Sequence, residues 1–502
     1  MAKPDPVSSL VALIAGGMVG RDSLAKDIEA ALDGIFGHRY AARSSSAKRV
    51  ALAADVAFAG LLHEESPASG VYGGMSLIWF PVPPDGDGHP AASLLTLVCG
   101  TRGLSPDEQI LGRPGHRRHL EALRRHLAKT CSIPMWAKQD PSNTALHMPR
   151  IMTDRYARFK EVLDRYGQYI YAAAAVPSDP AAARAVVCGF LDLYAWERGW
   201  VPLKAAQAEV EALRNSLRAE LFPKVDRARV VSLLHERRFV ILQGPPGTGK
   251  TRMADAILRE DFEGCGKTVQ FHPAVTYETF VSGIAPDVAQ DALSFRVKSG
   301  WLLAAIAEAQ ASPRPYLLHI DEINRADLGR VLGEAIYLFE AGEINAGRAR
   351  SVDLPSRPAG WPDPVRMPPN LYVLGTMNSA DRSIAILDLA VRRRFAFVDI
   401  WPDLSVVEEQ EFPLAIAAFG RLQDIFAEFS PPNALVLMPG HTYFLARTEQ
   451  ELHNRLRYEL VPLIHEYLVE GRLGPCETEL HAYLDWLEGE LTPGGESVRG
   501  NP

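Results

Sequence analysis

Cysteine is scarce in this sequence, and its spacing argues against several kinds of site. The five cysteines lie far apart and form no CxxC pair: Cys99, Cys131, Cys188, Cys265 and Cys476. Zinc and iron–sulfur sites built on cysteine need ligands at short spacing, and disulfide-rich folds need a denser cysteine framework. The composition therefore indicates a reducing, cytoplasmic setting.

The sequence also lacks a hydrophobic run long enough to span a membrane. Its first apolar stretch, Leu10 to Val19, falls short of the roughly 20 apolar residues that a bilayer requires. Only Lys3 precedes this stretch, and Gly16-Gly17 interrupts it. We therefore expect a buried first helix and not a signal peptide, and we expect no membrane partner.

Neither sign of charge dominates the chain. The net charge is −8 at pH 7, so the protein as a whole is not a generic binder of polyanions. A local basic region nevertheless lies between residues 101 and 130, which contain seven Lys or Arg but only three Asp or Glu. Four of its arginines lie off the leucine face of an expected helix: Arg117, Arg118, Arg124 and Arg125. They form either a face that contacts nucleic-acid phosphates or a solvated face in which Glu121 pairs with Arg125.

A length of 502 residues predicts more than one domain. Residues 1–170 mix helical and strand patterns, which predicts an α+β N-terminal domain that recognises a target or a partner. Its expected elements are a helix over 23–36, a hairpin of strands 75–82 and 93–98 around a Pro/Gly/Asp-rich loop, and a helix over 114–129.

A linker is expected over residues 171–204. The Ala-rich stretch 172–185 contains Pro177 and Pro180, which predicts a turn in an otherwise helical connection. A further helix is expected over 204–221.

The second half of the chain alternates apolar strands with helices, the pattern of a parallel sheet covered by helices. The expected strands are 239–243, 268–272, 316–320 and 371–377. We therefore predict an α/β nucleotide-binding domain over 205–402. A helical lid over 403–490 and a disordered Gly/Pro-rich tail over 491–502 are expected to follow.

A phosphate-binding loop follows the first of these strands. Its sequence matches GxxxxGK[ST] and comprises Gly244, Pro245, Pro246, Gly247, Thr248, Gly249, Lys250 and Thr251. The glycines let backbone N–H groups face the phosphates of GTP or ATP, Lys250 reaches the outer phosphates, and Thr251 binds Mg²⁺. A strand before the loop and a helix after it argue against a chance glycine-rich turn.

A second strand ends in two acids about 70 residues later. Asp321 at its end would hold Mg²⁺, and Glu322 would orient and deprotonate the attacking water. A strand that ends in acids is common. In a parallel sheet, however, the ends of both strands meet at one edge, so the two motifs together predict a hydrolytic site.

Polar residues after the next strand suggest further roles at the same edge. Asn378 could hydrogen-bond the attacking water or the terminal phosphate and so sense whether that phosphate is present, and Asp381 follows on the same loop. The alternative for each of them is a turn or a helix cap. Three arginines, Arg392, Arg393 and Arg394, follow a short helix. One of them could act on the nucleotide of a neighbouring subunit, which requires a ring. The alternative for these arginines is a solvated basic helix end.

Together these segments resemble one family. The loop is followed by Gln270-Phe-His-Pro273, Asp321-Glu-Ile-Asn-Arg-Ala326, Met377-Asn-Ser-Ala-Asp-Arg-Ser383, Arg392-Arg-Arg-Phe395 and Pro439-Gly-His-Thr-Tyr-Phe444. Over about 205–490 the chain is similar to the McrB family, the AAA+ motor subunits of McrBC-type restriction systems.

The resemblance implies a hexameric ring that hydrolyses nucleotide at subunit interfaces and works with a McrC-like nuclease on DNA. It assigns the sensor pair to Asn378 and Asp381, and the finger acting in trans to Arg392 or Arg393. GTP is the favoured nucleotide in that family, with ATP as the alternative here. Residues 1–200 do not resemble the family's DNA-reading domain, so recognition of modified bases does not carry over.

Our leading hypothesis is a ring-forming NTPase that drives or switches on a DNA-targeting defence complex. One alternative is a MoxR-like AAA+ chaperone that remodels a protein client. The segments 377–383 and 270–273 argue against it. Another alternative is a nucleotide-gated sensor that assembles on a phage signal.

Overall fold

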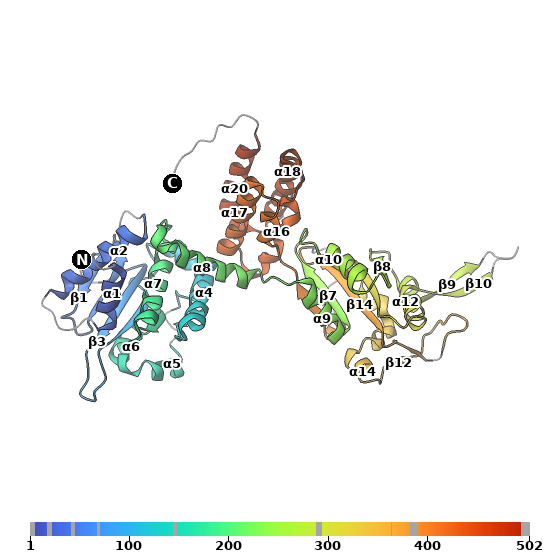
Figure 1. Ribbon diagram of the computed structural model, residues 1–502, viewed down its shortest axis with the longest axis horizontal. Helices are drawn as coiled ribbons and strands as arrows, with labels where there is room; N and C mark the ends of the chain where they lie inside the picture. The colour runs from blue at the N-terminus through green and yellow to red at the C-terminus, as the bar shows by residue number, and fades with distance from the viewer. Residues whose placement is uncertain are drawn as a thin grey trace. The chain divides into compact units, whose positions relative to one another are not determined.

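The computed structural model describes residues 6–17, 23–41, 46–67, 71–143, 148–287, 294–362, 364–381, 387 and 389–492. The chain forms two compact units (Figure 1). The first comprises Met1–Leu221 together with Ala427–Phe429, and the second comprises Phe222–Phe426 and Ser430–Pro502.

The first unit is built on a six-stranded antiparallel sheet. In sheet order its strands are β1 (Ser46–Ala51), β2 (Phe58–His63), β3 (Met75–Val82), β4 (Ala92–Cys99), β6 (Ile170–Ala175) and β5 (Trp136–Ala137). The expected hairpin is present, because β3 and β4 pair from Met75 opposite Cys99 to Val82 opposite Ala92.

Helices cover both faces of this sheet, which makes the unit α+β. One face packs against α1 (Pro6–Ala15), α2 (Leu24–Arg39), α4 (Pro114–Cys131), α7 (Pro180–Glu197) and α8 (Lys204–Leu221) (Figure 1). The opposite face packs against the segment of α5 (Arg150–Arg155) and α6 (Lys160–Tyr166). Side chains alternate along a strand, so Leu77 and Trp79 join the first core while Ile78 and Phe80 join the second. A short helix, α3 (Glu108–Gly112), precedes α4.

The region expected to be a linker is part of this first core. Its alanines form β6, and Pro180 begins α7. The Asp179 side chain caps that helix by accepting a hydrogen bond from the Ala182 N–H at 2.8 Å. Proline is tolerated at the first helical position because the N–H that it lacks would have no partner within the helix. The expected boundary between 170 and 205 therefore differs from the structure, in which the first unit runs on to Leu221.

The second unit contains the predicted parallel sheet. In sheet order its strands are β15 (Ala396–Asp399), β7 (Phe239–Gly244), β14 (Leu371–Asn378), β11 (Tyr316–Asp321) and β8 (Gly266–Gln270). One face packs against α9 (Arg227–Arg237) and α10 (Lys250–Ala256), and the other against α12 (Trp301–Gln310). This arrangement confirms the α/β fold class.

Shorter elements complete the sheet domain. They are α11 (Tyr277–Phe280), α13 (Leu328–Leu332), α14 (Ala341–Asn345), α15 (Leu389–Arg392), the hairpin of β9 (Ser282–Asp287) with β10 (Ser294–Ser299), and the pair of β12 (Ser351–Val352) with β13 (Val365–Arg366).

The C-terminal part is helical, as expected. It contains α16 (Leu404–Glu408), α17 (Pro413–Phe429), α18 (Glu449–Arg455), α19 (Val461–Val469) and α20 (Glu477–Leu491). Of the tail predicted to be disordered, residues 493–502 lie outside the described residues. Among the helices that the structure describes, none is long and apolar enough to cross a membrane.

Candidate nucleotide-hydrolysis site

The phosphate-binding loop joins β7 to α10, in the strand–loop–helix order that the motif requires. Gly247 and Gly249 have φ angles of 76° and 78°, a region that other residues rarely adopt. Gly249 occupies the N-cap position of α10, so the loop turns directly into the helix. The backbone N–H groups of such a turn are suited to binding phosphate oxygens.

The Lys250 side chain lies inside this loop. Its Nζ donates to the carbonyl oxygens of Gly244 at 3.0 Å and Pro245 at 2.6 Å. Burial lowers the pKa of Lys250 to about 8, although Glu322 and Asp321 favour its charged form. The lysine is thus a buried cation whose charged form is favoured by the two acids at the end of β11.

Asp321 accepts two hydroxyl hydrogen bonds at the edge of the sheet. The Thr251 hydroxyl donates to Asp321 Oδ1 at 3.0 Å, and the Thr376 hydroxyl donates to the same oxygen at 2.5 Å. Parallel pairing of β11 with β14 brings Thr376 there, two residues before the end of its strand. The structure therefore brings Thr251 and Asp321 together as predicted. It adds Thr376, for which the only sequence signal is its place near the end of β14.

Glu322 has a left-handed backbone, with φ at 53°. Such a conformation is unusual for a residue other than glycine and turns the chain sharply after β11. The Glu322 N–H donates to the Thr376 hydroxyl at 3.3 Å, so one threonine supports both acids.

Arg325 lies between the two acids assigned to catalysis and sensing. Its Nε is 3.3 Å from Glu322 Oε2, and its Nη2 is 3.9 Å from Asp381 Oδ2. Sequence analysis gave this arginine no role. The structure thus places Glu322 and Asp381 near the same guanidinium.

Asn378 ends β14 as predicted. Its side-chain oxygen accepts from the Ala380 N–H at 3.0 Å, and its backbone oxygen accepts from Asn324 Nδ2 at 3.2 Å. The first of these contacts is the turn-forming bond of the simpler interpretation. Arg382, which follows Asp381, lies outside the described residues.

The three arginines after α15 have different environments. Arg394 is buried, donates to the Ala390 carbonyl at 2.9 Å and lies 3.1 Å from Glu340, so it is structural. Arg393 is exposed, with its nearest acid, Glu340, at 3.7 Å. Arg392 is also exposed and lies over the Phe397 ring at 5.5 Å. Both candidate fingers thus face solvent, which fits a finger in trans and a solvated helix end alike.

A loop of the helical part packs on the phosphate-binding loop. The Gly440 N–H donates to the Pro246 carbonyl at 2.9 Å, and the Thr442 N–H donates to the Gly247 carbonyl at 3.0 Å. A Cβ atom at Gly440 would lie 2.0 Å from the Gly247 carbonyl carbon. Glycine at position 440 is therefore needed for this close approach.

Beside the loop is a pocket of about 440 Å³ that sequence analysis did not predict. Thr248 and Gly249 line it together with three segments far apart in the chain, which contribute Phe222, Lys224, Trp401, Asp403 and His441. The Phe222 and Trp401 rings meet edge to face with centroids 5.8 Å apart. An apolar pocket adjoining a phosphate-binding loop is suited to a nucleobase.

Two of the charged side chains that line this pocket form an ion pair. Lys224 Nζ lies 2.8 Å from Asp403 Oδ2. Burial alone would raise the pKa of Asp403, but hydrogen bonds from Lys224 and Ser405 lower it below its ordinary value. Burial lowers the pKa of His441, whose Nδ1 accepts from the Asp403 N–H at 3.3 Å. This ion pair therefore lies beside an imidazole whose neutral form is favoured, and the other charged residues of the pocket wall are Asp226, Arg227, Arg252 and Glu409.

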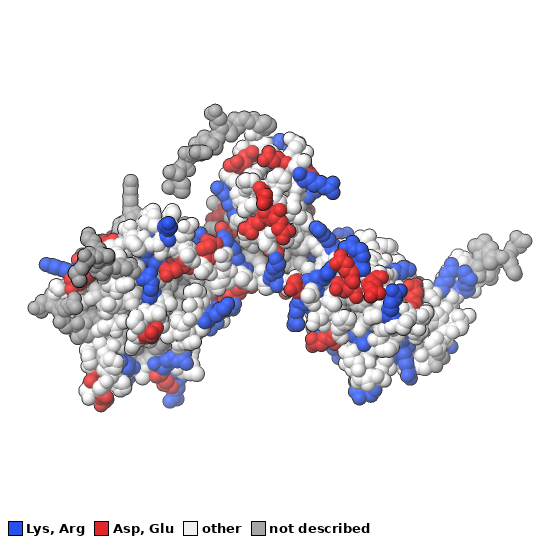
Figure 2. All heavy atoms as spheres, viewed as in Figure 1, with Lys and Arg blue, Asp and Glu red and all other residues white. Residues whose placement is uncertain are grey.

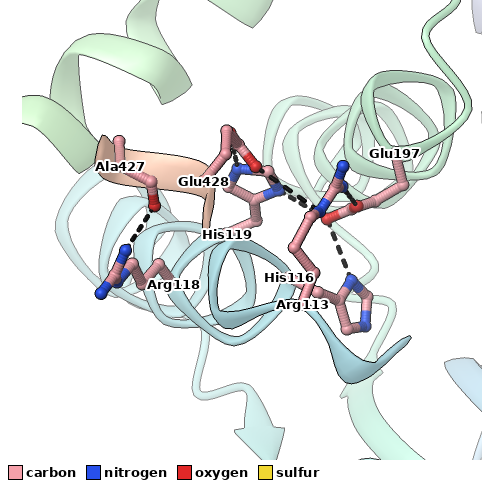
Figure 3. Close-up of polar contacts among 7 residues, drawn as sticks. All are labelled: Arg113, His116, Arg118, His119, Glu197, Ala427 and Glu428. Atoms are coloured by element: carbon pink, nitrogen blue, oxygen red, sulfur yellow. Dashed lines mark hydrogen bonds and ion pairs between the residues drawn. The ribbon is translucent and has the colours of Figure 1, made fainter. Parts of the chain in front are cut away.

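In the first unit, the predicted basic face of α4 is largely paired. Arg124 and Arg125 both bind Glu121, and Arg125 Nη1 also lies 2.6 Å from Glu220 Oε2. Arg118 donates to the Ala427 carbonyl at 2.6 Å (Figure 3). Arg117 is exposed. On the face drawn in Figure 2, basic side chains (blue) and acidic side chains (red) of this unit are interspersed. These contacts favour the solvated, ion-paired interpretation.

The histidines of α4 belong to a buried charge cluster instead. His116 Nδ1 and His119 Nδ1 lie 2.9 Å and 2.5 Å from Glu197 Oε1, and Arg113 Nη2 lies 2.5 Å from Glu197 Oε2 (Figure 3). Burial alone would lower the pKa of His119, but Glu197 and Glu428 raise it to about 9. The same histidines lower the pKa of Glu197 well below its ordinary value despite its burial. Sequence analysis missed this cluster.

Comparison with known proteins gives matches in the second unit. Residues 239–395 match the AAA domain family (dynein-related subfamily). The Type IV methyl-directed restriction enzyme EcoKMcrB subunit of Escherichia coli (strain K12) is 31% identical over 288 residues, 53% of this chain and 61% of that protein. The Type II restriction enzyme BsuMI component YdiS of Bacillus subtilis (strain 168) is 28% identical over 190 residues, 31% of this chain and 55% of that protein. The chain thus spans less than two thirds of the length of either relative.

Proposed function

We propose that this chain, which carries a McrB-like AAA+ nucleoside-triphosphatase domain, hydrolyses GTP in a ring and thereby drives or switches on a restriction complex. The observation that carries the proposal is the meeting of Thr251 and Thr376 on Asp321, beside Glu322 and the loop that holds Lys250. Nucleotide hydrolysis needs a phosphate cradle, a metal-binding pair and a base, and these residues supply all three.

The loop and Lys250 bind the phosphates. Backbone N–H groups of residues 247–250 contact the phosphate oxygens, and the Lys250 ammonium moves from the loop carbonyls to the outer phosphates. The negative charge of the nucleotide favours the charged form of this buried lysine. The same contact neutralises charge that builds up on the phosphate as its bond breaks.

Thr251 and Asp321 fit Mg²⁺. A hydroxyl and a carboxylate oxygen 3.0 Å apart, completed by phosphate oxygens and waters, match the hard oxygen ligands that this ion prefers. Mg²⁺ bound there would neutralise the phosphates and fix their orientation. Thr376 holds Asp321 in place for this role.

Glu322 activates the water. Its carboxylate accepts a proton from the water that attacks the terminal phosphate, while Arg325 fixes its position. Asp381 also lies near Arg325, so a movement of Asp381 on phosphate release would reach Glu322 through one side chain. Arg392 or Arg393 completes the site from a neighbouring subunit of the ring.

The nucleobase pocket supports guanine as the preferred base. Guanine presents an acceptor, O6, next to two donors, N1–H and the N2 amino group. Lys224 supplies a donor and Asp403 an acceptor, side by side at 2.8 Å. Adenine carries an amino group where guanine has O6, so it would face Lys224 donor to donor. A site that hydrogen-bonds one base rejects an analogue that leaves its polar groups unpaired.

The similarity to a restriction enzyme subunit and a restriction enzyme component supports the wider setting. We infer a cytoplasmic homo-oligomer, in the hexameric form common to AAA+ rings, that works with a McrC-like nuclease on DNA. The nuclease would be a separate chain.

The experiment that tests the proposal is hydrolysis of GTP, ATP and xanthosine triphosphate by the full chain, with Lys250→Ala as the blank. We expect GTP to be the preferred substrate. Asp403→Asn should weaken GTP use and favour xanthosine triphosphate, because its amide donates where the carboxylate accepted. Glu409→Gln, which alters another residue of the same pocket, is the matched control. ATP-selective turnover that Asp403→Asn leaves unchanged would contradict the guanine assignment.

A further inference from the structure

We propose that the first unit contains a second ligand site, which binds a nucleobase together with its phosphate. The site is a pocket of about 540 Å³ on the sheet face opposite α4 and α7. Its walls come from β1, β2, β3 and β4, from the segment before β3 and from the end of α6. A pocket of this size accepts a small organic molecule.

Aromatic side chains provide the flat surfaces that a nucleobase requires. Phe80 and Tyr166 stack with ring centroids 5.4 Å apart and an interplanar angle of 29°. Phe58 and Tyr72 line the same pocket from β2 and from the segment before β3. Stacking on aromatic rings is the usual way in which proteins hold an unpaired base.

A buried hydroxyl in the pocket has no hydrogen-bond partner among the described residues. Ser76 is 2% exposed, and its Oγ makes no hydrogen bond within this part of the chain. It lies on β3 with Ile78 and Phe80 on the same face, where an apolar residue would pack as well. A buried polar atom without a partner destabilises the folded protein. The edge of a nucleobase offers the donors and acceptors that would satisfy it.

The charged residues that line the pocket are both arginines. Arg49 on β1 and Arg165 at the end of α6 contribute to its wall, and no acid lines it within the described part of the chain. Arg165 lies 5.8 Å above the Tyr166 ring. This charge disfavours a cationic ligand such as a methylated lysine and favours a ligand that carries a phosphate.

The surroundings limit how much of a polyanion can bind. Arg165 also lines a neighbouring shallow depression whose other polar residues are Asp55, Glu161 and Asp164. The Arg165 guanidinium is 3.3 Å from Asp55, and both side chains are exposed. Acids on that side repel a phosphate backbone, so the pocket is suited to a single nucleotide unit. This unit is either a free nucleotide or one unstacked base of a strand.

This site is independent of the nucleotide-hydrolysis site. No motif of the second unit contributes to it, and the AAA domain match begins only at residue 239. The proposal of this second site can therefore be tested, and can fail, independently of the proposed GTPase function.

The test is isothermal titration calorimetry on the full chain carrying Lys250→Ala, which disables the other nucleotide site. The probes are the four nucleoside 5′-monophosphates and a ten-nucleotide single-stranded DNA of mixed sequence. We expect binding that Tyr166→Ala and Arg165→Gln each weaken about tenfold or more, because each removes a stacking or phosphate contact. Arg150→Gln alters an exposed arginine of the same unit outside the pocket and should leave binding unchanged.

Each binding result either identifies the ligand or contradicts the proposal. Monophosphates that bind through the pocket identify a free nucleotide as the ligand, and binding of the strand alone identifies an unstacked base. Absence of binding by every probe, or binding that both pocket variants leave intact, would overturn the proposal. Equal melting temperatures of the variants exclude unfolding as the cause of a loss.

Discussion

At the scale of single residues, the geometry around Asp321 assigns a role to Thr376. Its hydroxyl donates to Asp321 and accepts from the Glu322 N–H, so it positions both acids without touching substrate. A motif search finds the acids because they end an apolar strand. It does not find Thr376, because a threonine inside a strand is ordinary and its partner lies 55 residues away. Arg325 is missed for a similar reason, since its contact with Asp381 depends on how two loops fold.

Removal of this hydroxyl should slow hydrolysis more than it weakens nucleotide binding. In Thr376→Val the side chain keeps its shape, but Asp321 and the Glu322 backbone lose a partner. Residues that support metal ligands typically change activity by about 10–100-fold, and we expect a fall in kcat of that order. Thr268→Val on β8 of the same sheet is the control, because its hydroxyl contacts His319 and not Asp321. An unchanged kcat would show that Asp321 does not need this support.

At the scale of elements, α4 and α7 are joined by charge as well as by apolar packing. Glu197 on α7 is fully buried and holds His116, His119 and Arg113 (Figure 3). The leucines of α4 predict its buried side from their spacing. The histidines on that side become visible as ion-pair partners only when α7 is in place.

This cluster should make stability depend on pH. The pKa of His119 is raised to about 9, so its contribution is complete below the unfolded value of about 6.5 and is lost as pH rises through 9. The pKa of Glu197 is lowered, so its contribution is present above about 4.5 and is lost as pH falls below that value. The cluster therefore stabilises the unit most between about pH 5 and 6.5.

Glu197→Gln tests this dependence. The variant removes the buried carboxylate that pairs with His119, so that Glu428 is its remaining acidic partner. Breaking a buried ion pair costs about 3–5 kcal/mol, and we expect a loss of up to that size at pH 6. The difference in melting temperature between wild type and variant should narrow as pH rises through 9, as measured by thermal unfolding. Glu121→Gln, at a half-exposed pair on the same helix, should change the melting temperature little at any pH. A constant difference from pH 6 to 10 would be evidence against a charged His119.

At the scale of the whole molecule, the sequence was informative where short motifs carry the chemistry. The phosphate-binding loop, the Asp321–Glu322 pair and the parallel strands were all predicted, because each depends on local spacing. The nucleobase pocket was not, because Phe222, Trp401 and His441 come from three distant segments. The boundary near 170–205 differs from the structure because proline and alanine, which suggested a linker, begin a buried helix and fill a central strand.

The proposed ring predicts complementation between subunits. Arg392→Ala or Arg393→Ala, whichever is the finger, should lower hydrolysis by about 10³–10⁵-fold, because its arginine acts on a neighbour. Mixing that variant with Lys250→Ala should restore activity, since Lys250→Ala subunits donate an intact arginine to sites that retain their lysine. Arg350→Ala, another exposed arginine beside Glu340, is the control. Full activity in both variants, or no recovery on mixing, would contradict a finger in trans.

The central claim is that nucleotide is hydrolysed at the site formed by the loop and the end of β11. Its most direct test is Glu322→Gln, with nucleotide binding and phosphate release measured side by side. General-base catalysis contributes about 10²–10⁴-fold, so turnover should fall by that amount while binding persists. Full turnover by Glu322→Gln would contradict the account, because the proposed base would then have no role in the reaction.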